Sequence, residues 1–349
     1  MASIPQTMRA MRLHALGAIV DDREPLQLEH IPVPSPGTGE VLVRITACGV
    51  CHTELDEIEA RTAPPSLPVT PGHQVTGRVI AEGRGCDRGL LDRDIGIAWV
   101  SGACGSCKYC EGGFENLCPD FVATGRDRDG GYAEFIALDE RFVHPLPDTL
   151  DPVLAAPLLC AGAVGHRALR LCHLRNGQAL GLTGFGASGQ LVIRMARYLY
   201  PDSRVAVFAR NARERALAQE LGASWSGDTA TPAPFPLTAI IDTTPAWKPV
   251  RSALACLESG GRLVINAIRK EDADKSELLE LHYETHLWQE KSIQSVANVT
   301  RDDVRACLRL ASEIPLVPEV TTYPLEAANR ALLELRQGGS RGAKVLLMD

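Results

Sequence analysis

The stretch that decides the fold reads A-L-G-L-T-G-F-G-A-S-G and covers residues 179–189. Its apolar beginning predicts a short strand over 179–183, and the pattern behind it predicts a helix over 187–199. The glycines between the two permit a sharp turn and let a diphosphate approach the helix N-terminus, where free amides and the helix dipole attract anions. The residues that we expect to contact a dinucleotide here are Gly184, Gly186, Ala187, Ser188 and Gly189.

Strands and helices alternate on the C-terminal side of this turn. Such alternation implies parallel βαβ units with helices on both faces of one sheet. We therefore predict a doubly wound parallel sheet, an α/β fold, in the second half of the chain. The further strands expected in it are 205–208, 239–242, 262–266 and 292–297, and the helices are 212–221 and 250–257.

The end of the second predicted strand bears on the choice of cofactor. A carboxylate about 20 residues after the glycine-rich turn would hold the adenosine ribose and repel a 2′-phosphate. The chain instead has Ala209 there, followed by Arg210, with Arg213 and Arg215 close behind. Because guanidinium groups bind phosphate, we expect Arg210 to contact the cofactor and NADP(H) to be favoured over NAD(H). The alternative is that these arginines only form a solvated helix start.

The first part of the chain follows a different pattern, with short alternating strands separated by turns. This pattern predicts a β-rich domain. The strands expected in it are 41–47, 75–81, 95–100 and 132–138. Near the C-terminus we expect helices over 302–312 and 325–337 and a closing strand over 344–348.

Composition limits the class of protein. A chain of 349 residues with 45% apolar and 23% charged residues fits about two globular domains. A net charge of −7 leaves no broad basic face, so we expect no nucleic-acid partner. The longest apolar stretch, 153–165, is too short to span a membrane, and the N-terminus carries no secretion signal. We expect a cytoplasmic protein without membrane contact, whose eleven cysteines serve metal or redox chemistry.

Four cysteines form the first chemical signal. Their spacing is C-x2-C-x2-C-x7-C, with glycines supplying tight turns. Thiolates this close repel one another, and a divalent cation relieves the repulsion. A closed set of four leaves no position for substrate, so we predict a structural zinc ion held by Cys104, Cys107, Cys110 and Cys118. The alternatives are an iron–sulfur cluster, against which the seven-residue gap argues, a zinc-ribbon binding module and four unrelated buried thiols.

A second set of candidate ligands is dispersed along the chain. Cys51 follows a predicted strand, His73 precedes another, and Cys160 follows an apolar run. Two cysteines, one histidine and an open fourth position are a donor set of catalytic zinc. Taken singly, a buried cysteine is more often a small apolar residue, so the hypothesis rests on the three residues together. With the four-cysteine set it gives two zinc ions per chain.

In order and spacing, these motifs resemble the zinc-dependent alcohol dehydrogenases of the medium-chain dehydrogenase/reductase superfamily, over essentially the whole chain. The motifs that carry the likeness are Cys51-His52-Thr53, Gly72-His73, the four cysteines, Cys160-Ala161-Gly162 and the glycine-rich turn. Residues 53–59 and 295–300 look like a bacterial branch grouped with cinnamyl-alcohol-dehydrogenase-like enzymes.

The resemblance implies a division of the chain into two domains. A GroES-like catalytic domain would cover residues 1–160 and 299–349 and carry the structural zinc lobe at about 101–119. A Rossmann cofactor-binding domain would be inserted over 161–298. The resemblance also implies a homodimer or a homotetramer.

Roles for single residues follow from the same resemblance. Cys51, His73 and Cys160 would bind catalytic zinc, and Thr53 would accept the alcohol proton. Glu54 would hydrogen-bond the zinc-binding histidine and fix its tautomer. The remaining implied contacts are His52 and Arg341 with the cofactor, and Trp99 and Ile58 in the wall of the substrate pocket.

Two positions depart from the family's pattern. The family usually carries Glu directly after the zinc-binding His, as a transient ligand, whereas this chain has Gln74. A neutral amide is a poorer zinc ligand, which puts that step in doubt here. The family's proton relay often ends in a His three residues after the Thr, where this chain has Asp56. A carboxylate could carry the proton onward, or the relay could pass through water.

The implied activity is reversible hydride transfer between a small-molecule primary alcohol or aldehyde and NADP(H) or NAD(H). Bound zinc would lower the pKa of the alcohol, and the nicotinamide would take the hydride. One alternative is a polyol or sugar dehydrogenase of the same superfamily. A zinc-free quinone or enoyl reductase would leave the dispersed ligands idle. The alternative from another class is a non-catalytic zinc-binding dehydrogenase-like protein.

Overall fold

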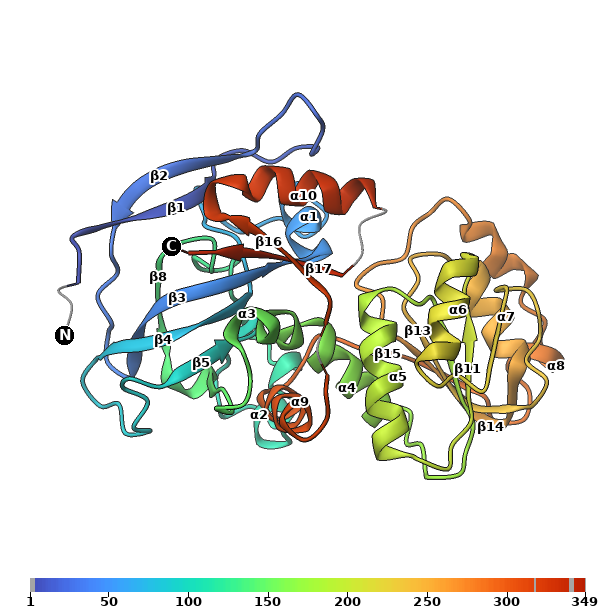
Figure 1. Cartoon of the computed structure of the whole chain (residues 1–349). Helices are drawn as coiled ribbons and strands as arrows, with labels where there is room; N and C mark the ends of the chain where they lie inside the picture. Colours follow the sequence, from blue (N-terminus) through green and yellow to red (C-terminus); the bar gives the residue numbers. More distant parts are fainter. Residues whose placement is uncertain (1–3, 317, 339–341, 349) are drawn as a thin grey trace. The chain divides into compact units, whose positions relative to one another are not determined.

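The computed structural model describes residues 4–316, 318–338 and 342–348. The chain forms two compact units, Met1–Cys160 together with Asn298–Asp349, and Ala161–Ala297. The first unit therefore takes its residues from both ends of the chain, coloured blue to green and red in Figure 1. The second is the segment inserted between them, coloured green-yellow to orange.

A mainly antiparallel sheet forms the centre of the first unit. Among the described residues it has seven strands, in the order β16-β17-β3-β4-β5-β9, with β8 also paired to β3. The pairing of β17 with β3 places the C-terminal strand beside the strand that leads to Cys51. The strands are β3 (Glu40–Val50), β4 (Gln74–Glu82), β5 (Asp94–Ile97), β8 (Phe135–Asp139), β9 (Val143–Pro145), β16 (Val320–Pro324) and β17 (Ala343–Leu347).

Smaller elements surround this sheet. Two two-stranded ribbons pair β1 with β2 and β6 with β7. Their bounds are β1 (Thr7–Leu13), β2 (Leu26–Pro32), β6 (Val100–Gly102) and β7 (Val122–Ala123). The helices are α1 (His52–Ile58), α2 (Lys108–Glu111), α3 (Pro152–Ala155), α9 (Arg301–Glu313) and α10 (Ala328–Gln337). The 3-10 helices are η1 (Glu115–Leu117), η2 (Glu140–Phe142), η3 (Ala156–Leu159) and η5 (Leu325–Ala327).

Strand β3 shows how the sequence selects the core. Val41, Val43 and Ile45 are each at most 2% exposed and belong to the main hydrophobic cluster of the unit. Leu42 points to the opposite face, where a smaller cluster with Phe135 covers it. Side chains alternate between the two faces of a strand, so both faces of β3 are buried here. Full burial of one such side chain stabilises the fold by about 1.5–3 kcal/mol.

The strand predicted over 95–100 is broken in the structure. β5 ends at Ile97, and the next strand pairs with β7 instead of continuing the large sheet. The carbonyls of Ala98 and Trp99 accept hydrogen bonds from the side chain and backbone of Thr124, so the chain leaves the sheet at this point. The apolar pattern of the sequence continues through the break, so the sequence did not indicate that the strand ends at Ile97.

The second unit is built on a parallel sheet. Its six strands among the described residues follow the order β12-β11-β10-β13-β14-β15, so the strand order reverses between β10 and β13. This order is that of the Rossmann fold, and the predicted fold class is confirmed. The strands are β10 (Leu180–Thr183), β11 (Val205–Phe208), β12 (Trp225–Gly227), β13 (Leu237–Asp242), β14 (Leu257–Ile265) and β15 (Ser292–Ser295). The helices are α4 (Ala161–Leu171), α5 (Ala187–Leu199), α6 (Ala212–Glu220), α7 (Lys248–Cys256), α8 (Tyr283–His286) and the 3-10 helix η4 (Lys275–Glu280).

The helices of the described residues are short. α5 and α9 reach 13 residues each. Within the described ranges, no single helix is long and apolar enough to cross a membrane. By length and composition alone, the segments Pro152–Leu159 and Ala161–Leu171 meet that requirement only as a bent pair.

Candidate active site

Cys51 and Glu54 shape the first turn of α1. Cys51 is the N-cap of this helix, and its backbone N–H donates to Oε2 of Glu54 at 2.9 Å. The Cys51 side chain in turn accepts from the backbone of Glu54, which makes a reciprocal capping box. The capping holds the thiol at the helix N-terminus. Oγ1 of Thr53 lies 3.6 Å from its Sγ atom.

A close crossing of two backbone segments holds His73. Hydrogen bonds of 2.7–2.9 Å join residues 70–72 to residues 130–132, and we call this contact the glycine crossing. Gly72 has a φ of +103°, in the left-handed region that favours glycine. A Cβ atom on Gly130 would lie 2.2 Å from the carbonyl oxygen of Gly72. The crossing thus requires glycine and fixes the backbone that leads into His73.

Glu54 joins two of the candidate ligands. Its Oε1 atom lies 2.5 Å from Nδ1 of His73, while its Oε2 accepts from Cys51. Both Glu54 and His73 are buried. The bond to Nδ1 leaves Nε2 of the imidazole for a metal and fixes the tautomer, as a carboxylate behind a ligating histidine does.

The structure brings the three dispersed candidates together. Cys160 follows η3, and its Sγ atom lies 3.9 Å from that of Cys51. The donor atoms of Cys51, His73 and Cys160 all lie within 4.8 Å of one another. Both cysteines keep some exposed surface. Two sulfurs and one imidazole nitrogen are donors that zinc prefers, with a fourth position left for substrate.

The charges of this set also fit a metal. The hydrogen bond from Cys160 lowers the pKa of Cys51 well below its usual value, and the same bond, with burial, raises the pKa of Cys160. Burial alone would lower the pKa of His73, but the charge of Glu54 and the bonds with Cys51 and Glu54 outweigh it and raise that pKa. A partly exposed thiolate beside the buried carboxylate of Glu54 is negative charge that a divalent cation relieves.

The four cysteines of the loop after β6 also converge. The Sγ atoms of Cys104 and Cys118 lie 3.5 Å apart, and all four donors lie within 4.8 Å of one another. Backbone N–H groups of Ser106 and Cys107, with a bond from Cys118, lower the pKa of Cys104 to about 6. Burial raises the pKa of Cys110 to about 12. A closed tetrad of sulfurs is the donor set of structural zinc.

Two predicted pocket and relay residues lie in a different setting from the one expected. Ile58 is fully buried in the main hydrophobic cluster of the first unit, so it does not line an open wall. The Asp56 carboxylate accepts from Nε of Arg61 at 2.6 Å, and Arg61 also pairs with Glu59. The contact with Arg61 thus occupies the carboxylate that was expected to carry the proton onward. His52, the first residue of α1, is exposed.

Gln74 lies at the start of β4, opposite Gly49 of β3. A Cβ atom on Gly49 would lie 2.7 Å from the Oε1 atom of Gln74, so the amide packs over the backbone of that glycine. Gln74 is 4% exposed. It is therefore a buried neutral neighbour of His73 in sequence.

Sequence reasoning missed Glu57, which lies one helical turn after Thr53 on α1. Its Oε1 atom accepts from Nε1 of Trp99 at 3.3 Å. Residues four apart share a helix face, and this spacing was the signal that could have revealed it. Trp99 also contacts Phe121, at 5.1 Å between ring centroids, and Arg126, at 5.2 Å.

The glycine-rich turn has the form that a dinucleotide needs. Gly184 has a φ of +79°, and a Cβ atom there would lie 2.7 Å from Oγ1 of Thr243. Gly186 caps α5 without a side-chain hydrogen bond, which leaves the first amides of the helix to an anion. A Cβ atom on Gly189 would lie 3.0 Å from the carbonyl of Gly184, so this glycine lets α5 pack closely on the turn. Ser188 contacts the carbonyl of Ala161 at 3.5 Å.

The arginines after β11 differ in their contacts. Nη1 of Arg215 donates to the carbonyls of Ala209 and Arg210 at 2.7 and 2.8 Å, so this arginine supports the local backbone. The backbone of Arg213 is capped by Asn211 at 2.9 Å. Arg210 is exposed, and within the described part of the chain its guanidinium has no hydrogen-bond or ion-pair partner. Arg341 lies outside the described residues.

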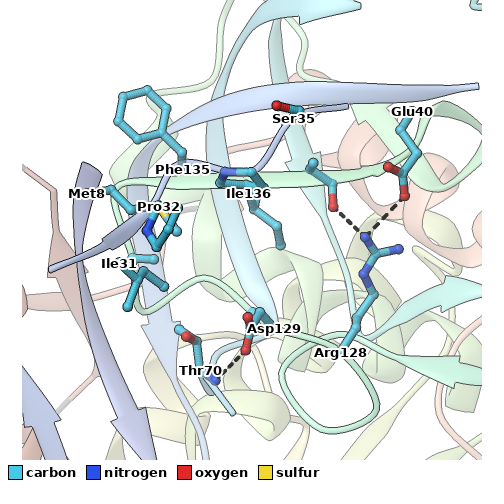
Figure 2. Close-up of a pocket in the computed structure, with 14 residues that line it drawn as sticks. Met8, Ile31, Pro32, Ser35, Glu40, Thr70, Arg128, Asp129, Phe135 and Ile136 are labelled. Carbon is cyan, nitrogen blue, oxygen red and sulfur yellow. Dashed lines mark hydrogen bonds and ion pairs between the residues drawn. The ribbon is translucent and has the colours of Figure 1, made fainter. Parts of the chain in front are cut away.

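A cavity of about 260 Å³ lies elsewhere in the first unit, beside the β1–β2 ribbon (Figure 2). Its polar groups are paired: Arg128 contacts Glu40, and Asp129 accepts from the backbone of Thr70. Among the described residues, none of the candidates from the sequence lines it. We assign it no role.

Solved structures share this fold. The acetophenone reductase from Geotrichum candidum in complex with NAD has a TM-score of 0.83 at 23% identity and covers 99% of both chains. The CAD from Helicobacter pylori complexed with NADP(H) has a TM-score of 0.84 at 21% identity, also over 99% of both chains. The chain therefore shares with them its fold of one mainly antiparallel unit and one Rossmann unit.

Sequence relatives define the family. The Alcohol dehydrogenase GroES-like domain matches residues 37–148. A protein of Mycobacterium tuberculosis named "Probable alcohol dehydrogenase AdhA" is 42% identical over 98% of this chain and 98% of its own length. The chain belongs to the zinc-dependent alcohol dehydrogenases of the medium-chain dehydrogenase/reductase superfamily. It is an oxidoreductase with alcohol dehydrogenase activity, as the sequence predicted.

Proposed function

We propose that the chain interconverts primary alcohols and aldehydes, with catalytic zinc held by Cys51, His73 and Cys160 and with NADP(H) favoured over NAD(H). The observation that carries this proposal is the convergence of three donors that lie far apart in the sequence. Unrelated thiols have no physical reason to meet a buried imidazole in this way.

The chain's own residues support the reaction at three points. Glu54 holds the tautomer of His73 by its bond to Nδ1. The Thr53 hydroxyl, next to Sγ of Cys51, is placed to take a hydrogen bond from the alcohol and pass the proton on. Zinc, when bound, supplies a Lewis acid for the substrate oxygen, and the nicotinamide supplies or accepts a hydride.

A substrate panel tests the proposal. Purified enzyme would be assayed with ethanol, benzyl alcohol and sorbitol, each with NADP⁺ and NAD⁺. We expect turnover of the simple primary alcohols, and zinc analysis to give two ions per chain. Preference for sorbitol would favour the polyol or sugar dehydrogenase instead. Full activity in protein without zinc would refute the catalytic role of the three ligands.

The preference for NADP(H) rests on Arg210. Its exposed guanidinium follows β11, where a carboxylate would otherwise reject a 2′-phosphate. Arg210→Ala should raise the KM for NADPH by about tenfold, the value of one lost charged hydrogen bond, and that for NADH much less. Arg213→Ala is the matched control. Equal effects of Arg210→Ala on both coenzymes would contradict the assignment.

We also propose that the enzyme is a homodimer or homotetramer. β15 is an edge strand of the parallel sheet, and Ile293 on it is 45% exposed. An open edge with unpaired backbone groups is a ready pairing surface for a second copy. Light scattering after gel filtration would give the mass of the particle, and a monomer at micromolar concentration would refute the proposal.

A further inference from the structure

Glu57 is a buried acid that the proposed reaction does not use. Glu57 lies on α1 and is 1% exposed. Oε1 accepts from Nε1 of Trp99 at 3.3 Å, whereas Oε2 has no hydrogen-bond partner among the described residues. Leaving a buried polar atom unpaired costs about 1–3 kcal/mol, so a carboxyl group is an expensive choice here for packing alone.

The surroundings of Glu57 do not make it half of an ion pair. The positive charges of His73 and Arg126 act on Glu57 without an ion pair to it, and Arg126 instead donates two hydrogen bonds to Asp127 at 2.8 and 2.9 Å and lies over the ring of Trp99. Burial, and then the charge of Glu54, raise the pKa of Glu57 to about 8. Among the described residues, the bond to the indole is the one hydrogen bond that the carboxyl group of Glu57 makes.

Trp99 needs such a contact to have one orientation. The terminal torsion of a tryptophan side chain is broad, so packing alone leaves more than one ring position open. The ring of Phe121 lies tilted by 44° at 5.1 Å between centroids, and Cζ of Arg126 lies over the indole at 5.2 Å from its centroid. Neither contact fixes the N–H edge of the indole. The carboxyl of Glu57 does, because a hydrogen bond has a direction.

We propose that Glu57 is a positioning residue that fixes the orientation of Trp99 and thereby sets which alcohols the enzyme prefers. The inference rests on the proposed function in one respect, namely that Trp99 forms part of the substrate wall. The hydrogen bond joins α1, which also carries Thr53, to the side chain that the proposed function puts in the substrate wall.

Three variants separate positioning from packing. Glu57→Gln keeps a carbonyl oxygen for the indole N–H, Glu57→Met removes the acceptor at similar volume, and Trp99→Phe removes the donor but keeps an aromatic ring. Glu140→Met is the control, because Glu140 is another buried carboxyl, 5% exposed, that instead accepts from the backbone of Asp87 and Arg88.

The first measurement is the indole resonance of Trp99 in zinc-loaded protein labelled with ¹⁵N-tryptophan. The chain has four tryptophans, and Trp99→Phe identifies the signal by its loss. We expect that signal to shift in Glu57→Met and to stay near its place in Glu57→Gln and Glu140→Met. An unmoved signal in Glu57→Met would overturn the proposed positioning, whatever the activity of the protein.

The second measurement is selectivity. The ratio of kcat/KM for benzyl alcohol to that for ethanol should change about fivefold in Glu57→Met, mainly through KM, as expected for loss of one hydrogen bond. Glu57→Gln should keep the wild-type ratio. The double variant Glu57→Met/Trp99→Phe should change the ratio no more than Trp99→Phe alone. Additive effects, or an unchanged ratio, would refute the role in selectivity. Absence of turnover with every alcohol in the wild type would instead refute the proposed function.

Discussion

The two cysteine clusters of the first unit bring their donor atoms together by opposite routes. The four-cysteine loop draws its sulfurs from one short segment, and Cys104 at its start is exposed. The other set draws Cys51, His73 and Cys160 from three separate segments around a buried imidazole. Local turns build the first cluster, whereas β3, the glycine crossing and η3 must all be in place before the second exists.

Each cluster has a glutamate that anchors it, and the two glutamates bind different parts of the structure. Glu54 bonds directly to His73 and to the backbone of Cys51, so it holds two donors of the dispersed set. Glu115, in the four-cysteine loop, bonds instead to Arg301 at the start of α9 and thus holds the loop to the rest of the unit. We therefore expect a metal in the loop to stabilise the structure, and a metal on the dispersed set to be open to a ligand.

The largest effect should follow from breaking the dispersed set. Cys160→Ala removes one of two sulfurs, and we expect kcat to fall by about a thousandfold or more, because the Lewis acid loses its site. Circular dichroism and coenzyme binding should change little. Cys307→Ala, which removes a buried thiol with no metal assigned to it, is the control and should keep turnover. Retained turnover in Cys160→Ala would exclude this ligand.

Breaking the four-cysteine loop should act on stability first. We expect Cys110→Ser to lose one of two zinc ions and to lower Tm by about 5 °C or more, as loss of a structural metal does. Zinc analysis and a thermal melt measure the two effects on the same sample. If the variant keeps both zinc ions and its Tm, the loop does not hold a structural metal.

Removing the carboxylates that anchor the two clusters should have smaller effects on zinc binding, and these effects should differ between the clusters. Glu54→Ala should weaken zinc binding at one site by about 10–100-fold, the usual cost of losing a carboxylate behind a ligating histidine. Competition with a chromophoric chelator measures the affinity. Glu115→Ala, which removes the matching anchor of the other cluster, should leave that site unchanged. The assignment fails if the two variants lose zinc from the same site.

The smallest expected effect is a pH dependence of the unfolding free energy that arises from the fold and not from a bound metal. His144 on β9 is buried, and burial, with the charges of Arg305, Arg88 and Arg301, lowers its pKa to about 3. The unfolded chain has a value near 6.5 and binds the proton more readily. The stability that neutral His144 contributes is therefore complete above pH 6.5 and is lost as the pH falls toward 3, by about 1.4 kcal/mol per unit.

A variant isolates this term from the protonation of zinc ligands. His144→Leu cannot titrate, so its urea-unfolding free energy should fall less than that of the wild type between pH 6.5 and 5. Both proteins keep the two cysteine clusters, and their difference removes the metal-dependent part. Parallel pH curves for the two proteins would show that His144 does not contribute.

Local signals explain which parts of the structure could be predicted. The strand and helix around the glycine-rich turn, expected over 179–183 and 187–199, form β10 and α5 with at most one residue of difference. Their apolar periodicity and glycines act within a few residues. The break after Ile97 depends instead on Thr124, far along the chain, and no local pattern records it.

The candidate site divides in the same way. The donors could be named because Cys and His carry metal chemistry in any setting, and a family likeness put them in order. Ile58 was expected in a pocket and lies in the core, because the face of α1 that it occupies is decided by packing. Glu57 was missed because a single acid gains meaning only from its partner, Trp99.

The glycine crossing behind His73 also limits how this enzyme can change. A Cβ atom on Gly130 would lie 2.2 Å from the carbonyl oxygen of Gly72, and one on Gly131 would lie 2.2 Å from the Val75 side chain. A mutational library aimed at new substrates would therefore lose most members randomised at these glycines to misfolding. Substitutions are better tolerated at exposed positions nearby, so a library for altered catalysts should randomise those positions and keep the glycines of the crossing.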